Sequence, residues 1–541
     1  MGIVNDGLPE GAISAPRHHP NRAARFALGY GRHLNVTKEL LDRHLAAGFA
    51  NRPAIRFDSR VLTYGVLSER VNRLANLLAH MGVNSGCRVL IHLPNRPEFV
   101  ESWLAVLRIG AVVVATVPLL RHHELSQIAS ETTPTCLITT PDLFPFFDER
   151  SHSPELRILI GKDVQEHLSY EKMLAQGSPF REPASTAEDD VAIIAYTSGT
   201  TGDQKGTIHT HSDILAIADT YAADILAPTR EDCFACHAPM GFTYGLGALL
   251  VFPLRFGASV VLAPGPFDPE RWLSIVEREK VTRLFTTPTA ARLYLEEKGC
   301  GHRPAWESVR TVVSAGEPLS KETFAEWRDI TGTEILDGCG STEMLHIWIS
   351  QRHGRALGGC TGWPVARYQV QLLDDTGQVL RGNEAEGVAA LRGPTGCRYW
   401  CQPGLQTQVV RDGWTLSGDR FRRDSTGRYW FVSRTDDMIV SGGYKISPFE
   451  VRNALLMHPA VRDAAVVGVS DAVRGQTVRA YLILHPEFDP SEMLANQIRD
   501  HTAREIALFK SPQEVVFLER FPETPTGKID RKALKALTNE S

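Results

Sequence analysis

The apolar positions in the first part of the chain alternate between helical spacing and short continuous runs. Leu67, Val71, Leu74 and Leu78 recur at the spacing of one helix face. Short runs typical of buried strands follow at residues 89–93, 111–117, 136–139, 156–160 and 191–195. A helical pattern over residues 98–109 separates the first two runs. This rhythm predicts an α/β fold whose large N-terminal domain contains doubly wound sheets.

The middle of the chain continues this pattern and then changes. Residues 212–227 have helical spacing, and residues 281–287 and 309–314 are further strand candidates. Over residues 369–430, short alternating stretches are separated by turns that contain Asp and Gly. This texture predicts a small, mainly antiparallel, β-rich subdomain.

A polar junction that ends in glycines, RTDDMIVSGG at residues 434–443, precedes a compact final unit. The pattern beyond it predicts a helix, two strands, a helix and a strand at residues 448–457, 464–469, 478–484, 492–507 and 514–518. We therefore predict an N-terminal domain over residues 1–433 and a small, mobile α+β domain over residues 434–541.

The composition narrows the class of protein. The 541 residues include 58 Lys and Arg against 63 Asp and Glu, which gives a net charge of −5. A nucleic-acid-binding protein would show a basic excess, so we expect no nucleic-acid partner. The start of the chain lacks the pattern of a secretory signal, and the apolar run at residues 109–120 is too short to span a bilayer. We expect a cytoplasmic protein that does not bind a membrane.

The cysteines contain one pattern with a chemical interpretation. Cys233, Cys236 and His237 match the C-x-x-C-H pattern of covalent haem attachment. That chemistry usually accompanies export, and no second pair of ligands at zinc spacing is evident. We therefore interpret these cysteines as small core residues beside a pocket.

A glycine- and hydroxyl-rich segment, YTSGTTGDQKG at residues 196–206, directly follows the strand candidate at 191–195. Glycines let the backbone approach a ligand closely, and N–H groups and hydroxyls can then bind phosphate oxygens. Lys205 adds a positive charge. The segment is not a Walker A loop, which ends in Gly-Lys-Ser/Thr. Such clusters are also typical of plain surface loops.

Four further segments have chemistry that suits a nucleotide. They are SAGEP at residues 314–318, DGCGSTE at 337–343, WTLSGD at 414–419 and PTGKIDR at 525–531. The second offers a hydroxyl for phosphate and a carboxylate for Mg²⁺, and the third ends in an aspartate suited to a ribose diol. Each segment alone is typical of an ordinary turn, so their common order along one chain is what carries the interpretation.

In that order these segments resemble the adenylate-forming superfamily of acyl-CoA synthetases, luciferases and adenylation domains, from about residue 40 to the end. Gln204 departs from the pattern, since the family usually has proline there; we expect a slightly looser loop because proline would fix φ.

The resemblance implies a role for each matching residue. Phosphate would be contacted by Thr197, Ser198, Gly199, Thr200, Thr201 and Lys205, with Thr342 at the α-phosphate. Adenine would be flanked by Gly316, Glu317, Pro318, Asp337 and Gly338, and the ribose held by Asp419 and Arg434. Lys528 would approach the α-phosphate and the substrate carboxylate, and Glu343 would bind Mg²⁺. Asp436 would be the hinge, with Gly442 and Gly443 at the tunnel for CoA.

The reaction that the resemblance implies has two steps. A carboxylate attacks the α-phosphorus of ATP to form an acyl-adenylate and pyrophosphate, and a thiol then displaces AMP. ATP, Mg²⁺ and coenzyme A are therefore the expected cofactors. An alternative is a freestanding adenylation enzyme that loads a carrier protein, and a second is a relative that only binds nucleotide; Lys528, Glu343 and Asp419 count against the latter.

The acid is indicated by two segments. PMGFTYGLG at residues 239–247 lies where the family lines its acyl pocket, with Phe242 at the aromatic gate and Tyr244, Gly245 and Leu246 facing the substrate. GSTEMLHI at residues 340–347 resembles the benzoate–CoA ligase branch, which places Gly340 and His346 at the substrate. This favours benzoate or a simple derivative such as 2-aminobenzoate or a hydroxybenzoate. A long-chain acid would need a deeper tunnel.

Overall fold

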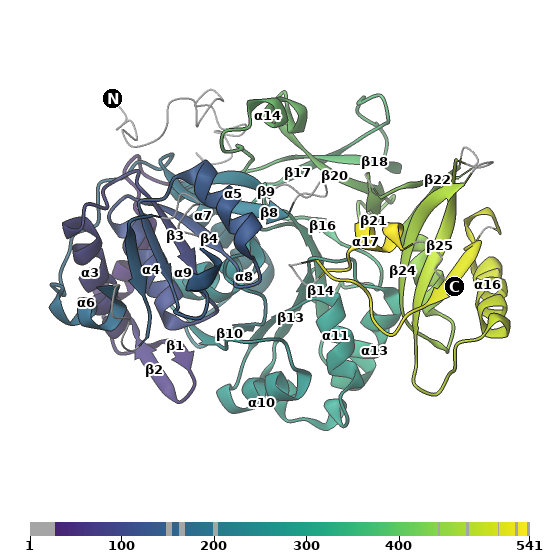
Figure 1. Ribbon diagram of the computed structural model, residues 1–541, viewed down its shortest axis with the longest axis horizontal. Coiled ribbons are helices and arrows are strands. Elements are labelled where there is room, and N and C mark those ends of the chain that lie inside the picture. Colours follow the sequence, from purple (N-terminus) through teal and green to yellow (C-terminus); the bar gives the residue numbers. More distant parts are fainter. Residues whose placement is uncertain are drawn as a thin grey trace.

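The computed structural model describes residues 27–147, 154–161, 168–198, 204–435, 437–441, 444–471, 475–506, 508–524 and 528–537. Across these residues, two large α/β sheets form the N-terminal part, and an antiparallel subdomain and a C-terminal α+β unit follow (Figure 1). The fold class predicted from the sequence is confirmed.

The first large sheet contains the strand that leads into the glycine-rich segment. Its strand order is β7(Leu168–Ser169), β6(Leu156–Leu159), β5(Cys136–Thr139), β3(Arg88–His92), β4(Val112–Thr116), β8(Val191–Ser198) and β9(Gln204–Thr210). Neighbours pair in parallel except β8 and β9. Helices α3(Tyr64–His80) and α4(Pro97–Arg108) share a core with one face, and α5(His122–Thr132) packs on the other. Because helices cover both faces of the sheet, the inner strands consist mainly of consecutive apolar residues.

The second large sheet carries two of the other predicted nucleotide segments, SAGEP at residues 314–318 and DGCGSTE at residues 337–343. Its order is β16(Trp363–Pro364), β15(Ile347–Ser350), β14(Ile335–Gly340), β13(Thr311–Ala315), β12(Arg283–Thr286), β10(Cys233–Cys236), β11(Ser259–Leu262), β1(Pro53–Phe57) and β2(Arg60–Thr63). One face is covered by α10(Pro269–Glu279), α11(Pro288–Glu296), α12(Ala305–Ser308) and α13(Lys321–Thr331). Helical segments α7(His211–Ile217), Ala218–Leu226, α8(Thr243–Leu246), Gly247–Val251 and α9(Phe252–Phe256) lie toward the other sheet. Short helices α2(Arg43–Ala46) and α6(Tyr170–Gln176) complete this part.

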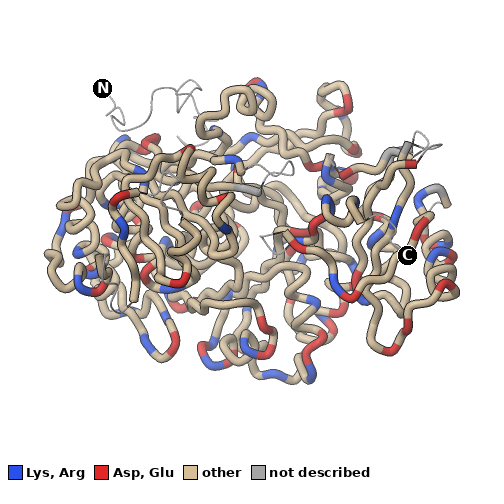
Figure 2. Tube along the Cα trace, in the orientation of Figure 1, with Lys and Arg blue, Asp and Glu red and all other residues tan. Residues whose placement is uncertain are grey.

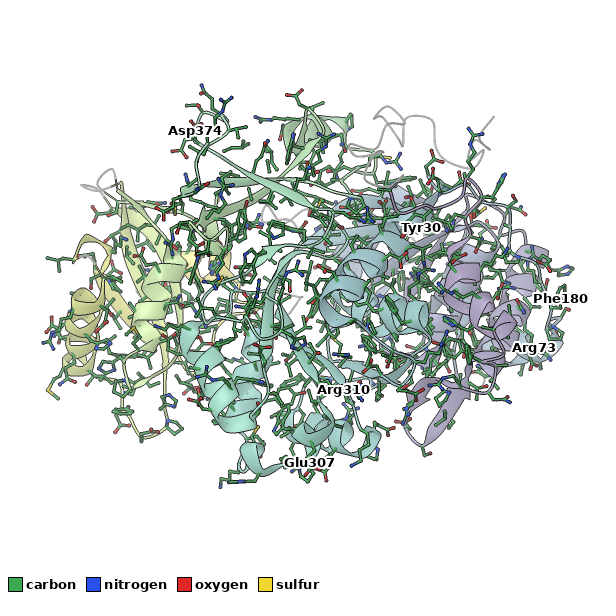
Figure 3. The ribbon with its side chains drawn as sticks, turned by 180° about the vertical axis from the view of Figure 1, so that it is seen from behind. Tyr30, Arg73, Phe180, Glu307, Arg310 and Asp374 are labelled. Atoms are coloured by element: carbon green, nitrogen blue, oxygen red, sulfur yellow. The ribbon has the colours of Figure 1, made fainter. Side chains whose placement is uncertain are left out.

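The β-rich subdomain is antiparallel, as predicted. Its order is β17(Gln369–Leu373), β18(Ala385–Arg392), β20(Trp414–Arg423) and β19(Val410–Arg411), with β21(Tyr429–Arg434) also paired to β20. Helix α14(Pro403–Val409) precedes β19. Asp374, in the turn after β17, lies at the outer edge of the molecule (Figure 3).

The C-terminal unit is built around a sheet in the order β23(Tyr444–Ile446), β22(Ile439–Ser441), β25(Gly475–Leu484) and β24(Val461–Asp471), with β26(Glu514–Phe517) beside β25. Helices α15(Pro448–Leu456) and α16(Glu492–Glu505) pack on one face, and α17(Arg531–Ala536) packs on the other. The five predicted elements correspond to α15, β24, β25, α16 and β26 and follow the predicted order, whereas β22, β23 and α17 were not predicted.

Strand β9 is one of the elements that the sequence analysis missed, and it is the one that matters most for the site. Its sequence, QKGTIHT, is mostly polar and has no alternation typical of a strand. It is nevertheless almost entirely buried, because it pairs with β8 on one side and with residues 398–400 on the other. This strand places Lys205 and organises the site described next.

Candidate active site

The glycine-rich segment connects β8 and β9 in an antiparallel hairpin. Thr197 lies opposite Lys205, and Ser198 lies opposite Gln204. These four residues therefore lie at the end of the hairpin from which the loop leaves. Gly199, Thr200 and Thr201 lie outside the described residues. Gly206 is closely surrounded, since a Cβ there would lie 3.0 Å from Cζ of Tyr196 and 3.1 Å from Cβ of Trp400.

Gln204, which stands where the family has proline, is held at its main chain. Its N–H donates to Oε1 of Gln127 at 3.4 Å, and Nε2 of Gln127 donates to its carbonyl at 3.3 Å. Proline would lack this donor. Proline would have fixed φ at this position, and the hydrogen bond from the Gln204 N–H replaces part of that constraint on the backbone.

Thr342 and Glu343 lie in the tight connection between β14 and β15. The main-chain N–H of Leu345 donates to the Thr342 carbonyl at 3.0 Å, and Leu345 has φ 69°. A branched side chain at positive φ is unusual and often marks a functional site. Nε2 of His209 on β9 donates to the same carbonyl at 2.7 Å, and the Tyr399 hydroxyl donates to Oε1 of Glu343 at 2.9 Å. The turn is thus tied to the phosphate hairpin.

The predicted adenine-binding residues lie at the carboxyl ends of β13 and β14. Gly316 has φ 93°, and Oε2 of Glu317 accepts a hydrogen bond from Thr289 at 2.8 Å. Asp337 is buried, and in the part of the chain that the structure describes its Oδ1 has no hydrogen-bond partner. Burial raises the pKa of Asp337 well above its ordinary value. A buried oxygen without a partner is costly, so this position fits a ligand donor such as the adenine amino group.

Asp419 and Arg434 face each other across β20 and β21. Their Oδ1 and Nη1 atoms are 3.1 Å apart, and the Cys339 thiol on β14 lies 4.0 Å from Oδ2 of Asp419. The predicted ribose residues therefore adjoin the predicted adenine residues, and this arrangement suits a nucleoside.

Lys528 of the C-terminal unit lies near the same region, since its charge acts on the Cys339 thiol of β14. Burial, Asp419 and Asp337 raise the pKa of the Cys339 thiol, while Arg434 and Lys528 lower it. The Lys528 side chain is exposed, and the main-chain carbonyl of Lys528 accepts a hydrogen bond from the N–H of Thr524 at 2.7 Å. Asp436, Gly442 and Gly443, predicted for the hinge and the CoA tunnel, lie outside the described residues.

His346 lies at the centre of an aromatic cluster, which consists of His346, Tyr221, Tyr244 and Phe252. The His346 ring stacks on Tyr244 at 5.7 Å with an interplanar angle of 25°, and its centroid lies 5.2 Å from that of Tyr221 and 4.7 Å from that of Phe252. Burial lowers the pKa of His346 to about 3, so the ring is neutral at physiological pH. Neither ring nitrogen has a hydrogen-bond partner among the described residues.

One π-helical segment carries a residue of this aromatic cluster, and a second π-helical segment ends directly before another. Tyr221 lies on Ala218–Leu226, and Gly247 begins Gly247–Val251, directly before Phe252. A Cβ at Gly247 would lie 2.4 Å from Cδ2 of His346, so the glycine lets the helix approach the ring. π-Helical turns occur frequently at functional sites. Tyr221 and Phe252 were not predicted, because aromatic residues in an apolar helix resemble ordinary core. Gly247 ends the predicted pocket segment 239–247, but no separate role was predicted for it.

The other predicted acyl-pocket residues have separate surroundings. Phe242 packs against the core that contains Tyr196 and Trp400, beside the phosphate hairpin, and no ring contact joins it to His346 in the described structure. The Tyr244 hydroxyl donates to the carbonyls of Thr286 at 2.8 Å and Val313 at 3.2 Å. Gly245 is needed for packing, since a Cβ there would lie 2.2 Å from the Pro239 carbonyl oxygen. A Cβ at Gly340 would lie 2.8 Å from the carbonyl oxygen of His346.

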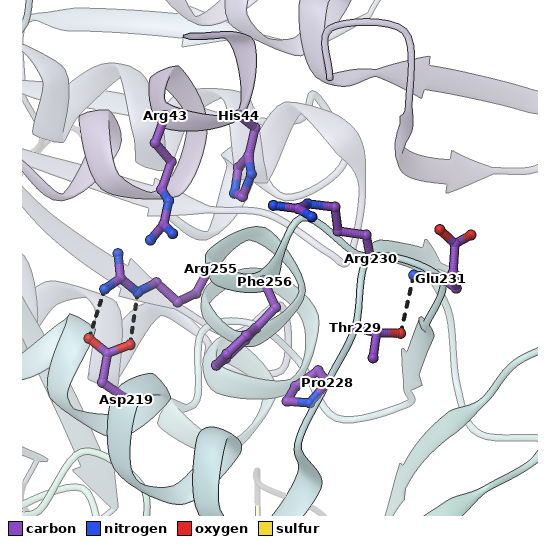
Figure 4. A pocket seen from close by; sticks show the side chains of 9 residues that line it. All are labelled: Arg43, His44, Asp219, Pro228, Thr229, Arg230, Glu231, Arg255 and Phe256. Carbon is purple, nitrogen blue, oxygen red and sulfur yellow. Dashed lines mark hydrogen bonds and ion pairs between the residues drawn. The ribbon is translucent and has the colours of Figure 1, made fainter. Parts of the chain in front are cut away.

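The C-x-x-C-H residues belong to the core. Cys233 and Cys236 lie on opposite faces of β10, in different hydrophobic clusters, and burial lowers the pKa of His237 to about 4. A charged surface pocket of about 490 Å³ lies at the other, amino end of β10 (Figure 4). Its Arg255 is paired with Asp219 at 2.8 Å, and none of the predicted site residues lines it.

The chain belongs to the AMP-binding enzyme family. That family's model matches residues 42–399, and the model of the AMP-binding enzyme C-terminal domain matches residues 450–528.

Individual relatives identify the branch. A benzoate–CoA ligase of Thauera aromatica is 32% identical over 505 residues, which cover 93% of this chain and 96% of the relative. A 3-hydroxybenzoate–CoA ligase of Aromatoleum sp. (strain CIB) is 32% identical over 514 residues, which cover 93% of this chain and 97% of the relative. A crystal structure of an anthranilate CoA ligase in complex with anthranoyl-AMP aligns with a TM-score of 0.89 at 32% identity, over 94% of this chain and 98% of that one. These relatives confirm the predicted superfamily and branch and support the predicted class, an AMP-forming acid–thiol ligase.

Two further observations concern the molecular surface. Positive and negative side chains are interspersed along the chain (Figure 2), in keeping with the net charge of −5. Among the helices of the described residues, none combines the length and apolar character needed to cross a membrane.

Proposed function

We propose that the protein is an ATP-dependent aryl acid–CoA ligase that activates benzoate or a simply substituted benzoate, such as 2-aminobenzoate or a hydroxybenzoate, through an acyl-adenylate. The observation that carries the proposal is the position of the aromatic cluster. His346 lies three residues after Glu343, in the same connection between β14 and β15. An aromatic ring bound there would have its carboxylate near the residues proposed to bind the α-phosphate.

A single aromatic ring suits the cluster chemically. Tyr244 and Phe252 offer a stacked and an edge-on contact to His346, and these are the geometries that aromatic groups prefer. A neutral His346 can donate one hydrogen bond to the acid or its adenylate without the cost of a buried charge. A long alkyl chain would gain nothing from ring geometry.

The first half-reaction joins the two parts of the site. The substrate carboxylate attacks the α-phosphorus, a new O–P bond forms, and pyrophosphate leaves. Thr197, Ser198 and Lys205 would bind the phosphates with Gly199, Thr200 and Thr201, and Thr342 and Lys528 would act at the α-phosphate. The attack brings two anions together, so each well-placed donor is worth about 3–4 kcal/mol in the transition state.

Glu343 fits Mg²⁺ by its chemistry. Mg²⁺ usually takes one or two carboxylates together with substrate phosphates, and Glu343 is a carboxylate tied to the phosphate hairpin through Tyr399 and the turn. Bound Mg²⁺ would neutralise part of the phosphate charge. The nucleoside would be held by Asp337 and Gly338, by Gly316 to Pro318, and by Asp419 and Arg434.

The second half-reaction needs a different arrangement. The thiol of CoA attacks the acyl carbonyl, the C–S bond forms as the C–O bond to AMP breaks, AMP leaves, and the thiol proton passes to solvent. For this step we propose that the C-terminal domain, residues 434–541, rotates at Asp436 against the N-terminal domain, residues 1–433. Gly442 and Gly443 would then line the pantetheine tunnel, and Phe242 would gate it.

The test is a substrate panel. Pyrophosphate release is measured with benzoate, 2-aminobenzoate, 3-hydroxybenzoate, octanoate and alanine, and thioester is measured with CoA and with a phosphopantetheinylated carrier protein. A benzoate with CoA should give the highest kcat/KM. Octanoate in first place would refute the proposed acid, and a preference for the carrier protein would favour the alternative of a freestanding adenylation enzyme.

A further inference from the structure

Tyr399 fixes one oxygen of Glu343. Its hydroxyl donates to Oε1 at 2.9 Å, and its side chain comes from a segment 56 residues further along the chain. Among the residues that the structure describes, this hydroxyl is the hydrogen-bond donor found for the Glu343 carboxylate, and it contacts Oε1 and not Oε2. The carboxylate is therefore held by one oxygen, and its rotation is restricted while the other oxygen stays available.

The backbone of Tyr399 is itself held without help from Glu343. Its N–H donates to Oε1 of Gln406 at 2.9 Å, and Nε2 of Gln406 donates to the Cys397 carbonyl at 3.1 Å. Tyr399 is 5% exposed, so its ring has little freedom to move. This is the rigid support that a precise hydrogen bond needs.

Strand β9 connects this support to the phosphate hairpin. The N–H of Ile208 donates to the Arg398 carbonyl at 2.7 Å, and the N–H of Trp400 donates to the Gly206 carbonyl at 2.8 Å. The same strand carries Lys205 and, through His209, holds the Thr342 carbonyl. The distance between Glu343 and the phosphate hairpin is consequently set by one strand.

We propose that Tyr399 is a positioning residue, which orients the Glu343 carboxylate so that Oε2 binds a divalent cation together with the phosphates of the nucleotide. The inference rests on the proposed function, because it assumes that the hairpin binds a nucleoside triphosphate. It assigns to a residue outside the predicted motifs the task of keeping the cation ligand in place before the cation arrives.

The experiment uses the full chain and Mn²⁺ as the probe. Mn²⁺ binding is measured by electron paramagnetic resonance in the presence of α,β-methylene-ATP and without any acid, so that no turnover contributes. Tyr399→Phe keeps the ring and removes the hydroxyl, and it should weaken Mn²⁺ binding by about tenfold, as loss of a hydrogen bond to a charged group does. Binding of the nucleotide in EDTA should remain unchanged.

Tyr429→Phe is the matched control. Tyr429 is also buried, and its hydroxyl donates to the Val370 carbonyl at 3.0 Å, outside the proposed site. This variant should bind Mn²⁺ like the wild type. In a Glu343→Gln background, Tyr399→Phe should add less than about twofold, because two residues acting through one contact are not additive.

An Mn²⁺ affinity of Tyr399→Phe within twofold of the wild type would overturn the proposal. The proposal would also be overturned if Tyr399→Phe weakened Mn²⁺ binding and nucleotide binding in EDTA by the same factor. That result would mean that Tyr399 supports the structure of the site as a whole. Failure of the proposed function is a separate result: the wild type would then bind Mn²⁺ and nucleotide as expected but form no aryl-CoA.

Discussion

Arg292 on helix α11 and Asp463 on strand β24 form an ion pair between the N-terminal and C-terminal units, with Nη2 and Oδ2 2.9 Å apart. Nη2 of Arg292 also donates to Thr289 at 3.3 Å, and Thr289 donates to Glu317. Burial raises the pKa of Asp463, but Arg452 and Arg292 reverse this effect and hold it below its ordinary value. A chain of polar contacts thus runs from the C-terminal unit to the proposed adenine turn.

This ion pair should stabilise the arrangement in which Lys528 lies near Cys339. The side chains of Arg292 and Asp463 are 14% and 17% exposed, so the pair is largely shielded from water, but Asp463 would keep Arg452 at 2.7 Å when Arg292 is replaced. We therefore expect Arg292→Gln to slow adenylation by about tenfold and to leave thioester formation from supplied aryl-adenylate unchanged; the two half-reactions are measured separately.

Arg462→Gln is the control for this prediction. Arg462 pairs with Glu296 at 2.5 Å across the same interface, but the two side chains are 37% and 36% exposed. An exposed pair contributes about 0–1 kcal/mol, so adenylation should change little. If Arg292→Gln and Arg462→Gln behave alike, the less exposed pair has no special role.

Gly247→Ala tests the aromatic cluster. The added Cβ would lie 2.4 Å from Cδ2 of His346 and 3.0 Å from Cζ of Phe252, so the His346 ring must move. Overpacking of this kind costs about 1–3 kcal/mol. We expect kcat/KM for benzoate to fall by about tenfold or more, with ATP binding preserved. Gly404→Ala, where no atom lies within 4 Å of the added Cβ, should be neutral. Unchanged benzoate kinetics in Gly247→Ala would place the substrate elsewhere.

Much of the fold could be predicted because parallel strands covered on both faces must be apolar throughout. Residues 136–139 illustrate this, since the predicted run and strand β5 coincide. The polar strand β9 could not be predicted, because its burial depends on Arg398 and Trp400, which are distant in sequence. The same reason applies to the site. Motifs indicated Glu343, but local sequence contains no signal that Tyr399 will meet it.

The pKa of His346 predicts a dependence of stability on pH. Burial lowers this pKa to about 3, whereas histidine in an unfolded chain titrates near 6.5. Below about pH 6.5 the unfolded chain binds a proton that the folded chain excludes, so His346 reduces stability by up to about 1.4 kcal/mol per pH unit; above that pH it has no such effect.

His346→Asn should remove this contribution. Between pH 6.5 and 5, the variant should lose about 2 kcal/mol less than the wild type in the unfolding transition of the N-terminal part, followed with urea. His80→Asn, at an exposed position at the end of α3, should keep the wild-type dependence. Parallel curves for wild type and His346→Asn would contradict the neutral, buried histidine.

Lys528→Ala tests the alternation between the two half-reactions. The charge of Lys528 lowers the pKa of the Cys339 thiol, which lies beside the proposed ribose contact Asp419. Loss of a donor to the α-phosphate should slow adenylation by about a hundredfold. CoA must later reach the same carbonyl, so the lysine has no task in the second step. Supplied aryl-adenylate should therefore be converted to thioester at a near-normal rate.

Lys532→Ala is the control for this prediction. Lys532 is an exposed lysine on α17, and its replacement should leave both rates unchanged. If Lys528→Ala slows both half-reactions equally, Lys528 supports the structure of the C-terminal unit and the proposed rotation loses its main argument.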